Sequence, residues 1–152
     1  MAAHRASGTT AGTMQTHWEH FAHGADVGVR GYGPTRAAAF EQAALALTGV
    51  VTDPAGVAGT NAVPIACEAA DDELLLARWL NAVASEMGQR HMLFGRYEVR
   101  LEGQRLRARA FGEPLSATRH APRVEVKGAT CTALRVGPDP QGGWVAQTVV
   151  DV

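Results

Sequence analysis

The chain has 152 residues, of which 46% are apolar, so length and composition fit one domain built around a single core. Its 14 basic and 15 acidic side chains give a formal net charge of -1. This balance argues against a generally basic surface for nucleic acid and against a polybasic membrane patch, and no apolar run approaches the roughly 20 residues that span a bilayer. Residues 1–16 lack the apolar segment of a secretory signal, and their small polar composition predicts a disordered tail before a folded domain over 17–152.

The first half of that domain alternates short strands with helices. Residues 17–23 and 27–33 read as two strands, and 34–54 read as a helix whose apolar positions follow the helical spacing: Phe40, Ala43, Ala44, Leu47 and Val51. A strand follows over 61–69, in which Pro64 indicates an edge position or the strand's beginning. A second helix over 71–88 is expected to end at Gly88, with a buried stripe of Leu76, Trp79, Leu80, Val83 and Met87.

The second half is mostly β-structure. Residues 96–113 alternate apolar and polar side chains about Glu102-Gly103, which predicts a hairpin. A further strand pair is expected over 123–136 and 143–152. The predicted fold class is therefore α+β, with two amphipathic helices packed on a mostly antiparallel sheet. Cys67 and Cys131 lie in apolar, strand-like stretches, so we expect buried free thiols in the reducing cytoplasm.

The sequence contains none of three common enzyme motifs. It contains no serine in a G-x-S-x-G turn, no P-loop and no G-x-G-x-x-G fingerprint. His17, His20 and His23 are spaced three apart, as some zinc ligands are, but side chains at that spacing alternate faces in a strand. Surface or turn histidines are the simpler interpretation.

Several charged groups nevertheless stand at unusual positions. Asp26 interrupts an extended region, Lys127 precedes a glycine in a β-rich stretch, and Asp151 is followed by Val152 and its α-carboxylate. Two aspartates and a terminal carboxylate would form an all-oxygen cluster, which suits calcium, magnesium or manganese. Each residue also has a simpler interpretation: a turn cap, a solvated strand lysine and a frayed terminus.

Five stretches resemble the archease family when taken together and in order. "HGADVG" is similar to its H-T-A-D-[VI]-G signature, and "GYGPTRAAAFEQAALALTGVVTDP" and "DDELLLARWLNAV" resemble its two helical motifs. "RARAFGEPLSATRHAPRVEVKGATCTAL" resembles its G-E-P, histidine and K-x-x-T segment, and "GWVAQTVVDV" its ending. The resemblance runs from about residue 17 to 152. It departs at Gly24, where the family has threonine, and at Cys131-Thr132, where it has tyrosine and histidine.

This resemblance implies an archease-like single domain and an accessory role without catalytic residues of its own. Its partner would be a GTP-dependent RNA ligase of tRNA splicing or RNA repair, whose guanylylation and multiple turnover it promotes. The protein would contact RNA only indirectly, through the ligase, and would not bind a membrane. The family's metal site maps to Asp26, Asp151 and Val152, with calcium the first expectation and magnesium or manganese the others. Lys127 and His23 are the residues expected to serve partner activation.

Two other classes of function remain open from the sequence. One is a general chaperone or interaction module for RNA-modifying enzymes. The other is a small metal-dependent phosphoester hydrolase, which would use the same acidic cluster and for which His23 is the nearest candidate base.

Overall fold

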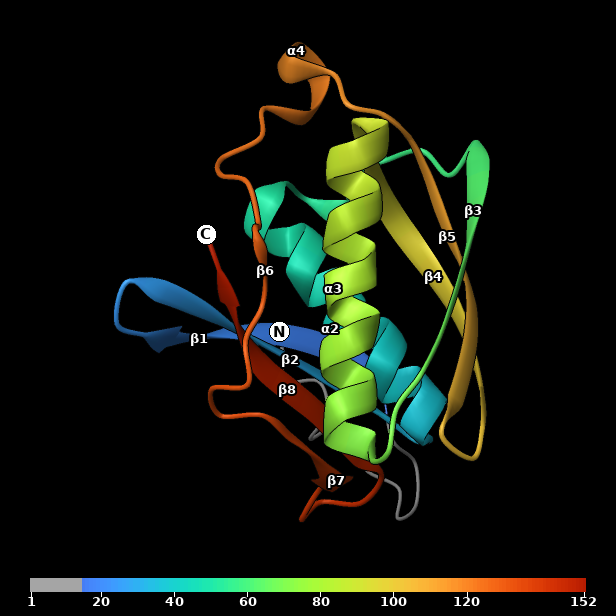
Figure 1. Cartoon of the computed structure of the whole chain (residues 1–152). Coiled ribbons are helices and arrows are strands. Elements are labelled where there is room, and N and C mark those ends of the chain that lie inside the picture. Colours follow the sequence, from blue (N-terminus) through green and yellow to red (C-terminus); the bar gives the residue numbers. More distant parts are fainter. Residues whose placement is uncertain (1–14) are drawn as a thin grey trace.

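The structure, a computed structural model, describes residues 15–152 (Figure 1). Most of the predicted tail over 1–16 lies outside the described residues. The elements follow one another as β1 (His17–His23), β2 (Asp26–Gly33), α2 (Arg36–Val51), η1 (Pro54–Gly56), β3 (Asn61–Glu68), α3 (Asp72–Arg90), β4 (Met92–Glu102), β5 (Arg105–Pro114), α4 (Ala117–His120), β6 (Gly128–Ala129), β7 (Arg135–Pro138) and β8 (Trp144–Asp151).

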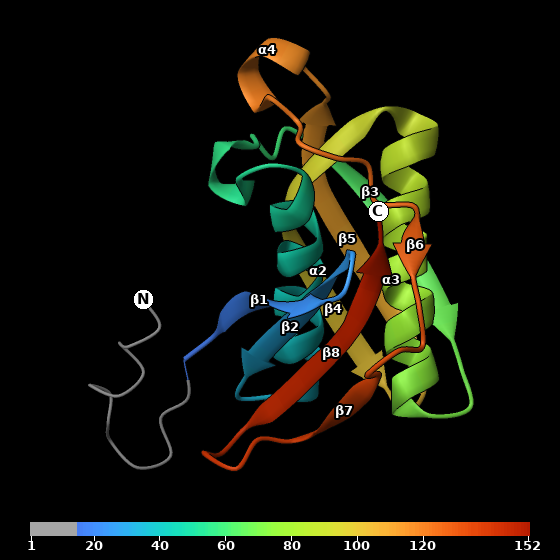
Figure 2. The ribbon, with the colours of Figure 1, turned by 90° about the vertical axis from the view of Figure 1, so that its left-hand side faces the viewer.

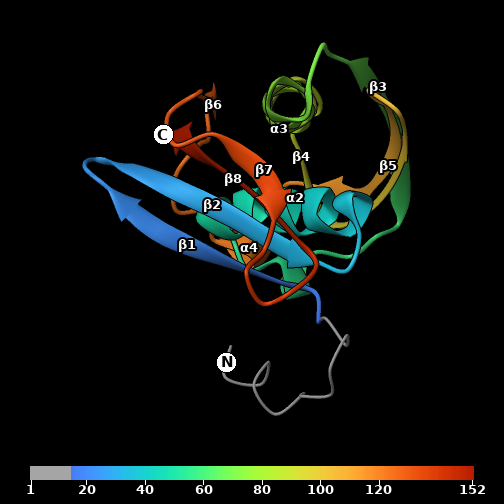
Figure 3. The same ribbon diagram turned by 90° about the horizontal axis from the view of Figure 1, so that it is seen from below.

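The described strands form two antiparallel sheets, which confirms the α+β class. The larger has the order β1-β2-β8-β6, with β7 also paired to β8, and the smaller has the order β3-β5-β4. Helix α2 contacts β2 and β8 on one side and β4 on the other, so it lies between the sheets (Figure 3). Helix α3 contacts β3 and β6 and closes the space beside α2. Since α2 is covered on two sides, it is buried over most of its surface.

Both helices begin where the sequence predicts. Thr35 caps α2 by accepting a hydrogen bond from the Ala38 N–H at 3.1 Å, and Asp71 caps α3 by accepting one from the Leu74 N–H at 2.8 Å. The predicted buried stripes of both helices are confirmed. The predicted end of α3 at Gly88 is wrong: the helix continues to Arg90 and ends where the next residue adopts φ 53°.

The smaller sheet follows the sequence closely. The β4–β5 hairpin turns at Gly103, whose φ of +58° suits glycine, and it extends the predicted range at both ends. Pro64 lies on β3, which pairs only with β5, so its edge position is confirmed.

The strand predicted over 123–136 is wrong as a continuous element, because it divides into the short strands β6 and β7. Its first residues are held by α2 instead of β8, since the Arg123 N–H donates to the Val51 carbonyl at 2.8 Å. Between β6 and β7 the chain is irregular but stays against β8, because the Thr130 N–H donates to the Val149 carbonyl at 2.9 Å and the Val149 N–H donates to the Thr132 carbonyl at 3.2 Å.

The cysteines are free, as predicted, but their predicted burial is wrong. Cys131 is exposed because it lies in the irregular segment between β6 and β7. Cys67 is only half-buried because it lies on the edge strand β3. Among the helices of residues 15–152, none combines the length and apolar character that a bilayer crossing requires.

Candidate metal and partner site

The pairing of β2 with β8 brings two distant aspartates to one corner of the larger sheet. Val27 lies opposite Val150, and continuing this register by one step places Asp26 opposite Asp151. Directly opposite residues of an antiparallel pair project to the same face. The two carboxylates therefore share a face at the end of β8, close to the β1–β2 turn (Figure 2).

The β1–β2 hairpin adds His23 to this corner, because His23 lies directly opposite Asp26. Its turn consists of Gly24, with φ +61°, and Ala25, so glycine stands where the backbone needs a positive φ. Gly24, which stands where the family has threonine, therefore has a structural role: it supports the tight turn that places His23 opposite Asp26. The His23 side chain is exposed, so it is accessible to a partner.

Lys127 joins the corner from the other side of β8. Its backbone N–H donates to the Asp151 carbonyl at 2.8 Å, and Gly128 lies opposite Asp151. Val152 is half-buried and packs against the core, which holds the end of β8 in place and argues against a frayed terminus. The backbone positions of all five residues selected from the sequence thus lie in or next to strand ends at this corner, although Gly128, and not Lys127, is the residue opposite Asp151.

Asn81 on α3 positions β6, a role that sequence reasoning missed. Its side-chain oxygen accepts a hydrogen bond from the Ala129 N–H at 2.9 Å, and its amide donates to the Ala129 carbonyl at 3.2 Å. A Cβ at Gly128 would lie 2.7 Å from the Asn81 Oδ1, so a larger residue there would displace the Asn81 side chain from Ala129. A signal was present: Asn81 is a polar residue directly after the buried pair Trp79-Leu80, within a quoted family motif.

The charges at this corner are not neutralised within the protein. Among residues 15–152, the side chains of Asp26, Asp151 and Lys127 have no hydrogen bond or ion pair to another described residue. Asp26 is half-buried, whereas Asp151 and Lys127 are exposed. Asp26 therefore does not act as a turn cap, since a cap would accept a backbone N–H.

The donor chemistry of the corner fits a hard cation held weakly. Carboxylate oxygens are the ligands that calcium, magnesium and manganese prefer. Within the described part of the chain, no group of three His, Cys, Asp or Glu side chains is placed to hold a metal ion. Asp26, Asp151 and His23 therefore do not form a metal-holding group by themselves, and a cation at this corner would need further oxygen ligands from the chain end, from water or from a partner.

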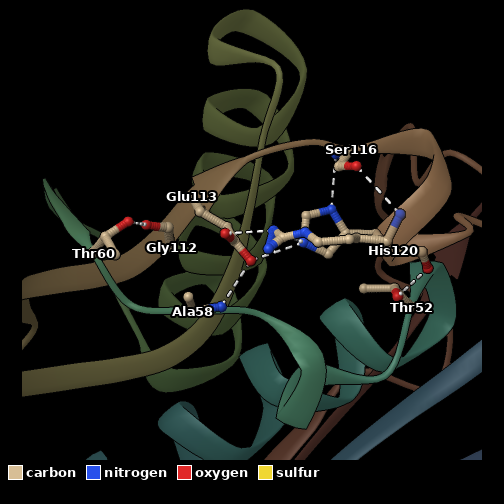
Figure 4. A network of polar contacts seen from close by, with 8 residues as sticks. Thr52, Ala58, Thr60, Gly112, Glu113, Ser116 and His120 are labelled. Carbon is tan, nitrogen blue, oxygen red and sulfur yellow. Dashed lines mark hydrogen bonds and ion pairs between the residues drawn. The ribbon is translucent and has the colours of Figure 1, made fainter.

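A second polar centre lies at the start of the segment that leads to Lys127 (Figure 4). The buried Glu113 carboxylate accepts hydrogen bonds from the Ala58 N–H at 2.8 Å and from His120 Nε2 at 2.9 Å, and pairs with Arg119 at 2.5 Å. His120 Nδ1 accepts from the Ser116 N–H at 2.8 Å, which leaves Nε2 as the protonated nitrogen. The Ala58 hydrogen bond, followed by that of His120, holds the pKa of Glu113 below its usual value.

This centre fixes the path of residues 115–127 over the molecule. The Thr52 hydroxyl at the end of α2 donates to the His120 carbonyl at 2.6 Å, and the Arg123 guanidinium donates to the Gly49 carbonyl at 2.7 Å. Glu113 and His120 are therefore positioning residues for the Lys127 segment, a role that no pattern in the sequence predicted.

Comparisons with known proteins found matches over most of the chain, including the residues of this corner. The model of the Archease protein family (MTH1598/TM1083) matches residues 18–152. Protein archease of Thermococcus gammatolerans is 40% identical over 139 residues, which cover 89% of this chain and 98% of that protein. Protein archease of Pyrococcus abyssi is 35% identical with the same coverage. The solution structure of Methanobacterium thermoautotrophicum protein 1598 is similar with a TM-score of 0.76 at 27% identity, over 89% of this chain and 98% of that one.

Proposed function

The chain belongs to the archease family, a membership that supports an accessory protein, and from that premise we propose that it activates a GTP-dependent RNA ligase. In this proposal it promotes guanylylation of the ligase and so sustains multiple turnover in tRNA splicing or RNA repair. The chain supplies charged groups to the partner's reaction and carries no catalytic residue of its own.

One observation supports this proposal: strand pairing brings the backbone positions of Asp26, Lys127 and Asp151 to one corner although they are distant in sequence. Their charges have no partner within the described residues. Three unpaired charges do not stabilise the folded state. An external partner is therefore the simplest reason for the arrangement. A surface corner with both signs of charge suits docking on another protein's charged site.

Asp26, Asp151 and the Val152 carboxylate are the groups that would hold a divalent cation, for which we propose calcium, with magnesium or manganese as alternatives. When bound, the cation would supply positive charge beside the phosphates of a nucleotide. Asp26 and Asp151 would orient and neutralise it, and the half-buried position of Asp26 would limit its hydration. The incomplete donor set fits a site that is completed only against the ligase.

Lys127 would act as a compact point charge towards phosphate, because an ammonium offers three donors on a flexible stem. Its backbone is tied to Asp151, so the cation side chain and the acidic pair would approach the ligase together. His23 lies on the opposite flank of the pair and is exposed, which suits contact with the partner protein.

The test is a multiple-turnover RNA ligation assay with the ligase partner, with and without this protein. Asp26→Ala and Lys127→Ala are expected to fold normally, as judged by circular dichroism, and to lose stimulation. Glu125→Gln, which changes one exposed charge of the loop before Lys127, is the matched control and should stimulate as the wild type does. Full stimulation by either alanine variant would refute the proposal. Turnover of a phosphoester by this protein alone with Mn²⁺ would favour the hydrolase interpretation instead.

A further inference from the structure

The outward face of the smaller sheet is rich in arginine. Side chains of β4 and β5 alternate, so that Val99 and Ala108 face the core while their neighbours face solvent. Five outward positions are arginines, which together we call the arginine face: Arg96, Arg100, Arg105, Arg107 and Arg109. Three carboxylates share this face, namely Glu68, Glu98 and Glu102. The near-neutral charge of the whole chain therefore conceals a local excess of positive charge.

Two of these arginines form an unfavourable pair. Arg100 lies directly opposite Arg107 in the β4–β5 register, and both are exposed. Within the described residues neither guanidinium forms an ion pair, whereas Glu98 pairs with Arg96 at 2.7 Å and with Arg109 at 2.8 Å. Like charges directly opposite each other destabilise a sheet, so the fold does not explain this pair.

Protection of an exposed sheet edge explains only part of this pattern. Charged residues on edge strands prevent pairing with other chains, which can account for Arg100 on the edge strand β4, but β5 is the central strand of its sheet. Every outward position of β5 from Arg105 to Arg109 is nevertheless an arginine. These side chains protect no edge.

The pair lies in a hollow that is large enough for a ligand. A depression of about 800 Å³ is lined by Arg100, Arg105 and Arg107, together with Glu68 and Glu102. Arg105 holds Glu68 at 3.3 Å, which leaves the opposed guanidinium groups as the groups best placed to receive an anion. Arginine binds phosphate through two parallel N–H donors.

On the same face, beyond the Glu98–Arg109 pair, the Arg96 guanidinium stacks over the Phe111 ring at 3.7 Å from its centroid. A guanidinium held flat in this way presents an outer plane on which a nucleic-acid base can stack. The carboxylate side chains of an acidic peptide have no aromatic ring that could stack on this plane. A strand of nucleic acid uses both features, since its phosphates meet the hollow and its bases meet the stacked side chains.

We propose that the arginine face binds the phosphate backbone of a single-stranded nucleic acid without reading its sequence. The face lies on the smaller sheet, on the far side of α2 from the corner of Asp26 and Asp151 (Figure 3). The proposal goes beyond ligase activation and holds or fails separately from it.

The test is fluorescence anisotropy with a labelled single-stranded RNA of about 16 nucleotides of mixed sequence, a length that spans the site of one sheet-based binding module. Each lost phosphate contact lowers the slope of log K against log salt by about 0.7 for single strands. The double variant Arg100→Gln/Arg107→Gln should therefore lower the slope by about 1.4 and weaken binding about 25-fold at 0.1 M salt.

The matched control is Arg90→Gln/Arg135→Gln, which removes the same charge from exposed positions on α3 and β7. It should bind within about twofold of the wild type at the same salt, because nonspecific attraction depends on total charge only weakly at that ionic strength. The test variant should melt no lower than the wild type, since it relieves like-charge repulsion. Equal weakening in both double variants would overturn the proposal. Binding of the wild type to polyglutamate but not to RNA would also overturn it, in favour of an acidic protein partner.

Discussion

Replacing Asp26 with asparagine should stabilise the protein in a chelator and remove its stabilisation by calcium. The β2–β8 register, continued by one step beyond Val27 and Val150, places Asp26 opposite Asp151, and no cationic side chain of the described residues pairs with either. Like charges in this position cost about 0.2–1 kcal/mol, and the half-buried position of Asp26 favours the upper part of that range. For a domain of this size 1 kcal/mol corresponds to about 2–4 °C, so the melting temperature in EDTA should rise by about 1–4 °C.

The assay is thermal unfolding followed by circular dichroism, in EDTA and across a calcium titration. A ligand present at 100 times its dissociation constant stabilises the native state by about 2.7 kcal/mol, so the wild type should gain about 5–10 °C at saturation. Asp26→Asn should gain almost nothing. Glu125→Gln removes one carboxylate from the exposed loop and should follow the wild type in both conditions. A lower melting temperature for Asp26→Asn in EDTA, or an equal gain in calcium, would refute the reasoning about this corner.

Two further predictions concern the residues that support the corner. The pKa of Glu113 is lowered in the folded protein, so the unfolded state binds the proton first as the pH falls. The stability that Glu113 contributes is therefore complete above about pH 4.5, near the pKa in the unfolded chain, and is lost below it. Glu113→Gln should therefore flatten the dependence of unfolding free energy on pH in urea titrations below pH 4.5, and an unchanged acid limb would contradict this account. Asn81→Ala removes two hydrogen bonds to Ala129 and should cost about 1–2 kcal/mol in urea unfolding. Asn81→Asp keeps the acceptor and should lose about half as much, whereas an alanine variant with an unchanged midpoint would show that Asn81 does not hold β6.

Local patterns in the sequence predicted the elements whose partners are near in the chain. The β4–β5 hairpin and the buried helix stripes depend on neighbours within one hairpin or a few helical turns. The stretch 123–136 was predicted as one strand because its composition suits β-structure. Its actual course depends on contacts with α2, which lie far away in sequence and leave no periodic signal.

The candidate corner depends on the non-local pairing of β2 with β8, so no local pattern could place Asp26 beside Asp151. The family resemblance supplied that expectation; the strand register brings the two backbone positions to one corner, and a metal site there stays a prediction. Asn81 and the Glu113–His120 pair were harder to identify, because a polar residue in a helix or strand reads as solvated unless its distant acceptor is known. The metal and the ligase remain proposals.

Strand β8 is a central strand of the larger sheet, yet every other strand of that sheet is synthesised before it. A nascent or truncated chain that stops before Trp144 leaves β2 with an open edge and leaves β6 and β7 with nothing to pair with. Such a chain exposes an unpaired strand edge, which favours aggregation, and lacks the position of Asp151 beside β2. The corner of Asp26 and Asp151 therefore forms only once β8 has been synthesised and has closed the sheet.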